Sequence, residues 1–321
     1  MRARLTAIVA LSLAALAAGC TGPGTATWHG TSGAGSASQS PGGAPAPSAP
    51  PAAPAVAPSS APAKAFAVGV RHLTLARGAD RPLPTTVWYP AAGAPGGTPK
   101  SGAAPAPGRF PLVLFSHGLG GTPENYEAAL RRWAAAGFVV AGPAYPNTSG
   151  HSKSVNVLDI GNQPTDASYV VTEVLKQFNG QVDPARIGAA GHSAGGFTTV
   201  GLFTAKRDAR LRAGIVIAGG PLGGAYTGPA APLLFVHGDQ DATVSYDTGR
   251  QAYDKDPWPK AFLTLVGQGH TDYLGPGDAF DAAMRTSTDF LRWGLYGDAA
   301  ARARLAADGT RAGVCRLDRN F

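Results

Sequence analysis

Beyond residue 63 the hydrophobic pattern alternates between short apolar runs and amphipathic segments. The apolar runs have the composition of buried parallel strands. They cover residues 110–115, 138–141, 187–190, 214–218, 233–236 and 262–266, with a further strand expected at 85–90. Between them, apolar residues recur at helical spacing. Helices are predicted at 122–137, at 164–178, after residue 193 and at 278–295. This alternation predicts an α/β fold, with a mostly parallel central sheet and helices on both faces.

Residues 1–63 do not follow this pattern. Two arginines precede an apolar run at residues 5–18, which is too short to span a bilayer comfortably and predicts an export signal over residues 1–19. Residues 20–63 consist mainly of Gly, Ser, Pro, Ala and Thr, a composition that predicts a disordered tether. The folded domain is therefore expected at 64–321. A second low-complexity stretch, 91–108, predicts a long surface loop, and no insertion is long enough for a large lid.

Charge and cysteine content exclude several classes of protein. Only 15% of the residues are charged, and the formal net charge of +7 is spread thinly, which argues against nucleic-acid binding. Two cysteines, Cys20 and Cys315, cannot build a disulfide scaffold or a zinc site of four cysteines. We expect no cofactor and no metal, and we expect a monomer. The state of Cys315 stays open.

The motif Gly191-His192-Ser193-Ala194-Gly195-Gly196 follows a predicted strand and opens a predicted helix. A GxSxG sequence in this context places a serine on a tight turn that lifts its hydroxyl above the sheet. The flanking glycines are needed because a Cβ there would collide with the neighbouring strand or helix. Ser193 is therefore the predicted nucleophile.

A serine hydroxyl needs a histidine to take its proton, and the histidine needs a carboxylate to orient it. Of the two histidines after Ser193, His237 ends a buried strand and is interpreted as structural. His270 lies on the loop after the next strand and is the predicted base. Asp239 and Asp241 both follow the strand at 233–236, and the local sequence does not separate them.

Four segments resemble the branch of the α/β-hydrolases that contains platelet-activating-factor acetylhydrolases, plant chlorophyllases and dienelactone-hydrolase-like proteins. They are residues 87–90, the loop at 115–121, the Ser193 motif and the HGDQDATV segment at 237–244. The resemblance implies that Asp241 is the acid and Asp239 a turn residue. It also matches the turn at 163–166 to a short Pro-x-Asp turn of that family. Dienelactone hydrolases proper carry cysteine at the elbow, where this chain has Ser193.

The same resemblance implies that the backbone amides of Leu119 and Ala194 form an oxyanion hole, with His117 supporting the loop. His192, Tyr145 and Tyr273 are hypothesised to line the substrate cleft. Cutinase-type polyester hydrolases are also similar in size and elbow, but the Trp they carry after the elbow helix has no counterpart at 218–222.

The end of the export signal, residues 16–20, resembles the lipobox of bacterial lipoproteins, with Leu16 one position earlier than usual. The resemblance implies cleavage before Cys20 and acylation of its thiol. The protein is then expected on the outer face of the bacterial cell membrane, held by a lipid anchor, and otherwise to be secreted.

Together these features predict an exported serine esterase that forms an acyl-enzyme. A polyester hydrolase, a phospholipid acyl hydrolase, or an amidase or acyltransferase would use the same triad. A catalytically silent surface-binding protein is expected to lack a triad residue, and this chain has all three.

Overall fold

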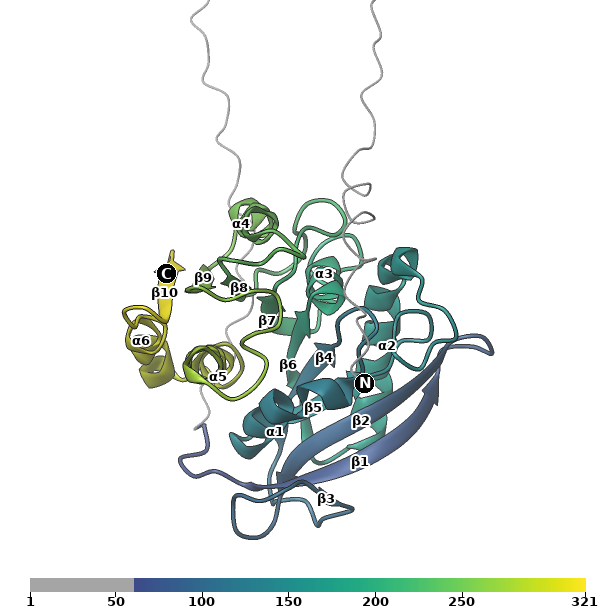
Figure 1. Ribbon diagram of the computed structural model, residues 1–321. Coiled ribbons are helices and arrows are strands. Elements are labelled where there is room, and N and C mark those ends of the chain that lie inside the picture. The colour runs from purple at the N-terminus through teal and green to yellow at the C-terminus, as the bar shows by residue number, and fades with distance from the viewer. Residues whose placement is uncertain (1–60) are drawn as a thin grey trace, which may run out of the picture. The chain divides into compact units, whose positions relative to one another are not determined.

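A ten-stranded sheet runs through residues 61–321, the part of the chain that the computed structural model describes (Figure 1). Its strands lie in the order β10-β9-β8-β7-β6-β4-β5-β2-β1-β3. The strands are β1 (Ala67–Ala76), β2 (Pro82–Ala91), β3 (Lys100–Ser101), β4 (Phe110–Ser116), β5 (Val139–Pro143), β6 (Val182–His192), β7 (Leu211–Ile217), β8 (Leu233–Gly238), β9 (Lys260–Leu265) and β10 (Cys315–Arg319).

The centre of the sheet, from β9 to β5, is parallel throughout. All seven residues of β4 are buried, as expected of a strand covered on both faces. At one end β10 pairs antiparallel with β9. At the other end β2 pairs antiparallel with β5 and with β1, and the short strand β3 pairs parallel with β1 at the edge. The predicted α/β-hydrolase fold with a mostly parallel sheet is confirmed.

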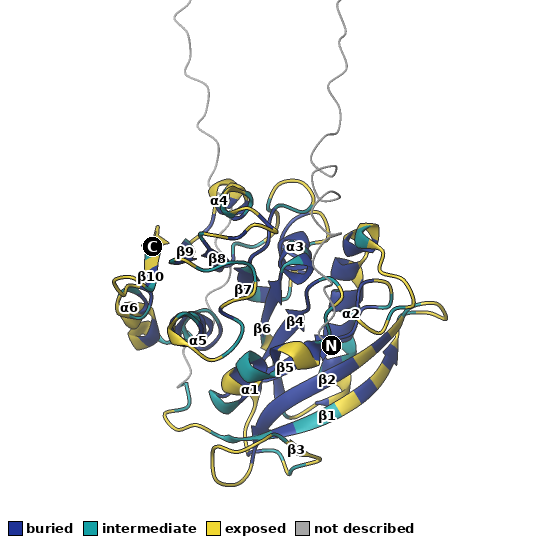
Figure 2. Ribbon diagram, in the orientation of Figure 1, coloured by how far each residue is buried: buried dark blue, intermediate teal, exposed yellow. Residues whose placement is uncertain are grey.

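Helices cover both faces of the sheet (Figure 2). Buried residues of α2, α3 and α4 belong to the core on one face, and those of α1, α5 and α6 to the core on the other. The helices are η2 (Pro123–Tyr126), α1 (Glu127–Ala135), η3 (Val157–Gly161), α2 (Gln163–Gln177), α3 (Ala194–Gly201), α4 (Tyr246–Lys255), α5 (Asp278–Leu291), the π-helical turn η4 (Arg292–Tyr296) and α6 (Ala299–Asp308).

The helices form where the sequence supplies one apolar face and a start signal. In α2, Pro164 occupies the first turn, where no intrahelical amide bond is lost, and Val170, Val171 and Val174 are buried against the sheet. The predicted helix at 122–137 is divided into η2 and α1. Leu130 and Trp133 supply the buried face of α1.

Two elements differ from their prediction. The stretch at 91–108 is not a plain loop, because Lys100 and Ser101 form β3 beside β1, and Ala91 bridges to Pro105. The last predicted helix ends as α5 at Leu291 and continues as η4. At the carboxyl edge of the parallel strands, the connections at 144–162 and 218–232 contain no inserted helical domain among the described residues.

The predicted signal at 1–19 and Cys20 lie outside the described residues, as does most of the tether predicted for 20–63. The predicted boundary at residue 64 stays a prediction. Described residues just before it contact the domain, since Arg292 Nη2 donates a hydrogen bond of 3.1 Å to the Pro62 carbonyl. Within 61–321, no helix has the length and apolar character needed to cross a membrane.

Candidate active site

Ser193 occupies the turn between β6 and α3, at the carboxyl edge of the parallel strands. Its backbone has φ 55° and ψ −120°, a conformation that residues with a Cβ rarely adopt. A Cβ on Gly195 would collide with the Ser116 carbonyl, and a Cβ on Gly191 with the Gly195 carbonyl. The glycines therefore allow the close approach that forces the turn, and the turn leaves Ser193 partly exposed.

Ser193 and His270, predicted from motif order, and Asp241, implied by the family resemblance, lie in one hydrogen-bonded row. Ser193 Oγ is 2.9 Å from His270 Nε2, and His270 Nδ1 is 2.7 Å from Asp241 Oδ2. A carboxylate only accepts hydrogen bonds, so His270 Nδ1 carries the proton and donates it. Nε2 of the neutral ring is then free to accept the hydrogen of the Ser193 hydroxyl. This geometry allows the imidazole to remove the serine proton.

Asp241 is held as a carboxylate by its surroundings. Its Oδ1 accepts hydrogen bonds from the amides of Thr243, at 2.8 Å, and Val244, at 2.9 Å. Its Oδ2 lies 3.3 Å from His237 Nε2 as well as facing His270. Burial works to raise the pKa of Asp241, but the hydrogen bonds from His237, His270 and the Val244 amide together keep its pKa well below the usual range.

The hydrogen-bond partners also distinguish the roles of Asp239 and Asp241. Asp239 Oδ1 accepts the Gly267 amide hydrogen at 2.7 Å, and Asp239 Oδ2 lies 3.6 Å from Arg316. Asp239 thus ties together two loops at the sheet edge. Of the two aspartates, Asp241 is the one that hydrogen-bonds His270.

A second hydrogen-bonded row lies beneath the first and involves His192. Burial, with His270 close by, lowers the pKa of His192 to about 3, so the ring is neutral. Its Nε2 donates to the His270 carbonyl at 2.9 Å, which leaves Nδ1 to accept from the Tyr126 hydroxyl at 2.9 Å. The Tyr126 oxygen in turn accepts the Gly118 amide hydrogen at 3.0 Å. This row connects the elbow, the His270 loop and the loop after β4.

The predicted oxyanion donors lie on two different segments. Leu119 belongs to the loop after β4, and Ala194 is the first residue of α3, where helix amides carry partial positive charge. No acceptor for either amide is found among residues 61–321. Gly118 is needed between them, because a Cβ there would approach Ser193 Cβ to 3.3 Å and the Tyr126 oxygen to 2.9 Å.

His117 supports this loop from inside the protein. Burial lowers the pKa of His117 to about 4, so its ring is neutral. Its Nδ1 donates to the Gly118 carbonyl at 2.8 Å, and its Nε2 accepts the Tyr145 amide hydrogen at 3.1 Å.

The three residues hypothesised to line the cleft are buried instead. Tyr145 is 0% exposed, and its hydroxyl bonds the Ser116 hydroxyl at 2.8 Å. His192 is 2% exposed and hydrogen-bonds the Tyr126 hydroxyl and the His270 carbonyl. Tyr273 is 2% exposed and lines an apolar pocket together with Phe115. The structure corrects this expectation, since the three side chains lie within or beneath the site and do not wall an open cleft.

The sequence did not single out Gln163 as a site residue, although it directly precedes Pro164 in the segment 163–166. Its side chain is fully buried and hydrogen-bonds Thr148 and Thr198, which belong to segments next to the two predicted oxyanion donors.

Residues 98–234 match the model of the Chlorophyllase family, which is part of the α/β-hydrolase superfamily. The match covers the loop after β4 and the Ser193 elbow, and it ends before Asp241 and His270. No curated protein matches the chain in sequence. The sheet topology and the family match together show an α/β-hydrolase fold, and residues 98–234 are similar to the Chlorophyllase family.

Proposed function

We propose that this hydrolase cleaves carboxylic esters through an acyl-enzyme, with Ser193 as nucleophile, His270 as base and Asp241 as the residue that orients the base. The observation that carries the proposal is the unbroken row from Ser193 Oγ through the His270 ring to Asp241 Oδ2, with bonds of 2.9 and 2.7 Å. The family match supports it, since the matched segment includes the elbow.

The proposed reaction has two halves. Ser193 Oγ attacks the ester carbonyl carbon while its proton passes to His270 Nε2, and the carbonyl oxygen becomes an oxyanion that accepts hydrogen bonds from the Leu119 and Ala194 amides. The tetrahedral intermediate expels the alcohol, which takes the proton from His270. A water molecule then attacks the acyl-enzyme by the same route and releases the acid.

Replacement of the triad residues tests this proposal. We expect Ser193→Ala to lower kcat by about 10⁶-fold and to abolish labelling by a fluorophosphonate, because no other group takes over the attack. Asp241→Asn should lower kcat by about 10³- to 10⁴-fold, since an amide stabilises the wrong His270 tautomer. The measurements are turnover of p-nitrophenyl esters of increasing acyl length, with matching amides, and thermal unfolding of each variant.

Asp239→Asn is the matched control, because it changes the same loop and leaves the contact with His270 intact. If Asp239→Asn were inactive and Asp241→Asn fully active, the acid would be misassigned. If Ser193→Ala kept its activity and its labelling, the serine mechanism would have to be abandoned. Faster cleavage of amides than of esters would point to an amidase on the same triad.

We further propose that the enzyme is exported and anchored through an acylated Cys20. This proposal rests on the sequence of residues 1–20, where acyl chains would contribute about 0.8 kcal/mol per buried methylene to membrane binding. Full-length protein should partition with membranes, and Cys20→Ala should release it to the medium or block processing. Cys315→Ala, which changes a buried cysteine of the domain, should leave partitioning unchanged. Soluble protein that begins at another residue would rule out the anchor.

A further inference from the structure

Gln163, the first residue of α2, is a fully buried polar side chain whose two polar atoms both have partners. Its Nε2 donates to Thr148 Oγ1 at 2.5 Å, and its Oε1 accepts from Thr198 Oγ1. Thr148 and Thr198 are themselves 0% exposed. A buried amide with both ends bonded has little freedom to move, so it fixes the distance between the two segments that it joins.

Each of these contacts leads to one of the two proposed oxyanion donors. The Thr148 carbonyl accepts the Gly120 amide hydrogen at 2.7 Å, and Gly120 directly follows Leu119. Thr198 lies one helical turn after Ala194, and its Oγ1 is 2.9 Å from the Ala194 carbonyl oxygen. Gln163 therefore connects, through Thr148, the loop that carries the first donor with the helix that carries the second.

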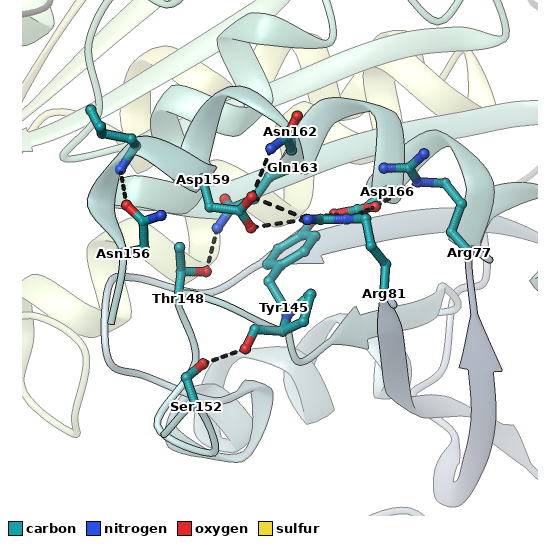
Figure 3. A network of polar contacts seen from close by, with 12 residues as sticks. Arg77, Arg81, Tyr145, Thr148, Ser152, Asn156, Asp159, Asn162, Gln163 and Asp166 are labelled. Carbon is teal, nitrogen blue, oxygen red and sulfur yellow. Dashed lines mark hydrogen bonds and ion pairs between the residues drawn. The ribbon is translucent and has the colours of Figure 1, made fainter. Parts of the chain in front are cut away.

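The start of α2, where Gln163 lies, is held by an ionic cluster that consists of Arg77, Arg81, Asp159 and Asp166 and is called the Arg81 cluster (Figure 3). Arg81 contacts Asp166 through Nε at 2.9 Å and Nη2 at 2.5 Å, and Asp159 through Nη1 at 3.1 Å and Nη2 at 2.9 Å. Asp159 lies in η3, four residues before Gln163, and Asp166 lies in α2, three residues after it. The Arg81 cluster thus fixes the start of α2 from both sides of Gln163.

We propose that Gln163 is a positioning residue that sets the separation of the Leu119 and Ala194 amides in the oxyanion hole. The inference rests on the proposed ester hydrolysis. Because the oxyanion forms only in the transition state, correct placement of its donors accelerates the reaction without strengthening substrate binding. A side chain of similar length without polar atoms would leave the buried hydroxyls of Thr148 and Thr198 without their shared partner, and the two segments would be free to shift.

The test is Gln163→Met, measured with a short-chain ester. We expect kcat and kcat/KM to fall together by about 10- to 100-fold while KM changes by less than about threefold, as for an interaction that is made only in the transition state. The affinity for an alkyl boronic acid, which forms a tetrahedral adduct on Ser193, should fall by a similar factor. The affinity for the carboxylic acid product should stay within about twofold.

Hydroxyl variants keep the proposal testable if Gln163→Met folds poorly. Thr198→Val and Thr148→Val remove one contact of Gln163 each and should show the same split between kcat and KM, whereas Thr198→Ser and Thr148→Ser should retain most of the wild-type rate. Thr199→Val is the matched control, because Thr199 is equally buried and bonds the Gly195 carbonyl of its own helix at 2.9 Å. It should keep kcat within about threefold.

The outcomes separate this inference from the proposed function. Loss of activity in Ser193→Ala together with unchanged kcat and boronate affinity in Gln163→Met would overturn the role of Gln163 alone. A rise in KM with constant kcat would overturn it as well, since that pattern indicates a role in ground-state binding. Equal losses in Thr198→Val and Thr199→Val, in step with lowered melting temperatures, would mean that the contact is only structural. Activity in Ser193→Ala would overturn the proposed function itself.

Discussion

Two regions of this molecule bury carboxylates in opposite ways. In the Arg81 cluster, Asp159 and Asp166 are 5% and 0% exposed, and Arg81 bonds both of them. On the connection from α4 to β9, Asp256 is 1% exposed. Its Oδ1 accepts the Trp258 amide hydrogen at 3.0 Å, and its Oδ2 has no hydrogen-bond partner among the described residues. The carboxylates of the two regions are almost equally buried, and they differ in their hydrogen-bond partners.

The consequence is visible in the pKa values. Burial works to raise the pKa of Asp159, but hydrogen bonds from Arg81 and Asn162 outweigh it and lower the pKa below the ordinary value. Burial raises the pKa of Asp256 to about 7, against the weaker opposing effects of the Trp258 amide and Lys260. A guanidinium in contact therefore keeps one buried carboxylate charged, while the other loses its charge near neutral pH.

The Arg81 cluster lies close to the proposed active site, and Asp256 lies on a connection between α4 and β9. The Arg81 cluster fixes the start of α2 beside Gln163, next to the proposed oxyanion donors. A buried ion cluster gains little stability over apolar packing, so its use here fits a need for fixed geometry. Among the described residues, the Lys260 ammonium near Asp256 donates to backbone carbonyls, those of Tyr253 at 2.7 Å, Asp254 at 3.4 Å and Asp256 at 2.6 Å, and not to the Asp256 carboxylate.

Arg81→Met gives the largest expected effect on stability. Removing the cation leaves Asp159 and Asp166 buried, with Arg77 as the remaining positive partner of Asp166 at 2.7 Å. Breaking a buried pair in this way costs about 3–5 kcal/mol of unfolding free energy. The measurement is urea unfolding at pH 7 and at lower pH.

The pH dependence of this loss has a definite sign. In the wild type, Asp159 has a lower pKa in the folded protein than in the unfolded chain, where the pKa is near 4. The resulting stability is present above about pH 4 and is lost as the pH falls toward the folded-state pKa. In Arg81→Met the buried carboxylates lose the cation and should bind protons at a higher pH than in the wild type. The difference in unfolding free energy between the two proteins should therefore shrink as the pH falls from 7. Arg311→Met is the control, since the Arg311–Asp278 pair is 50% and 66% exposed and should contribute less than about 1 kcal/mol. Equal losses of unfolding free energy in Arg81→Met and Arg311→Met would mean that the Arg81 cluster contributes no more than an exposed ion pair.

The sequence predicts the parts of the fold that bury continuous apolar surface. Central strands such as β4 are apolar throughout, and α2 has a clear apolar face. Elements with few buried positions were not predicted. In α4 only Gly249, Ala252 and Tyr253 are buried, and β10 is a short, mostly exposed edge strand. Their positions depend on tertiary contacts that periodicity does not report.

For the site, motif order was enough to name Ser193 and His270 and to place the acid on the loop after the strand at 233–236. The choice between Asp239 and Asp241 needed the family pattern, since both carboxylates lie on one short loop. Gln163 could not be recognised, because its partners lie 15 and 35 residues away in the chain. The burial of Tyr145 and Tyr273 could not be predicted either, because an aromatic residue near a motif can line a cleft or pack in the core.

Asp256→Asn should change the free energy of unfolding less than Arg81→Met does. At neutral and alkaline pH it should stabilise the protein, whereas Arg81→Met destabilises it. Because the folded pKa is raised above the unfolded value, the protonated carboxyl contributes stability that is fully present below about pH 4 and is lost as the pH rises to about 7. An asparagine has nearly the same shape and cannot ionise. We expect the variant to match the wild type near pH 4 and to be about 1–3 kcal/mol more stable at pH 8, because it avoids the buried charge.

The measurement is the free energy of unfolding in urea between pH 4 and 9 for both proteins. The difference should grow between about pH 4 and 7 and then level off, since above pH 7 the Asp256 carboxyl is ionised in the folded and in the unfolded chain. Asp254→Asn is the matched control, because Asp254 lies in the last turn of α4, two residues before Asp256, with its side chain 65% exposed. The stability difference for this variant should not grow with pH. A difference that stays constant with pH would mean that Asp256 titrates as an ordinary carboxylate, and the contrast between the two regions would then rest on geometry alone.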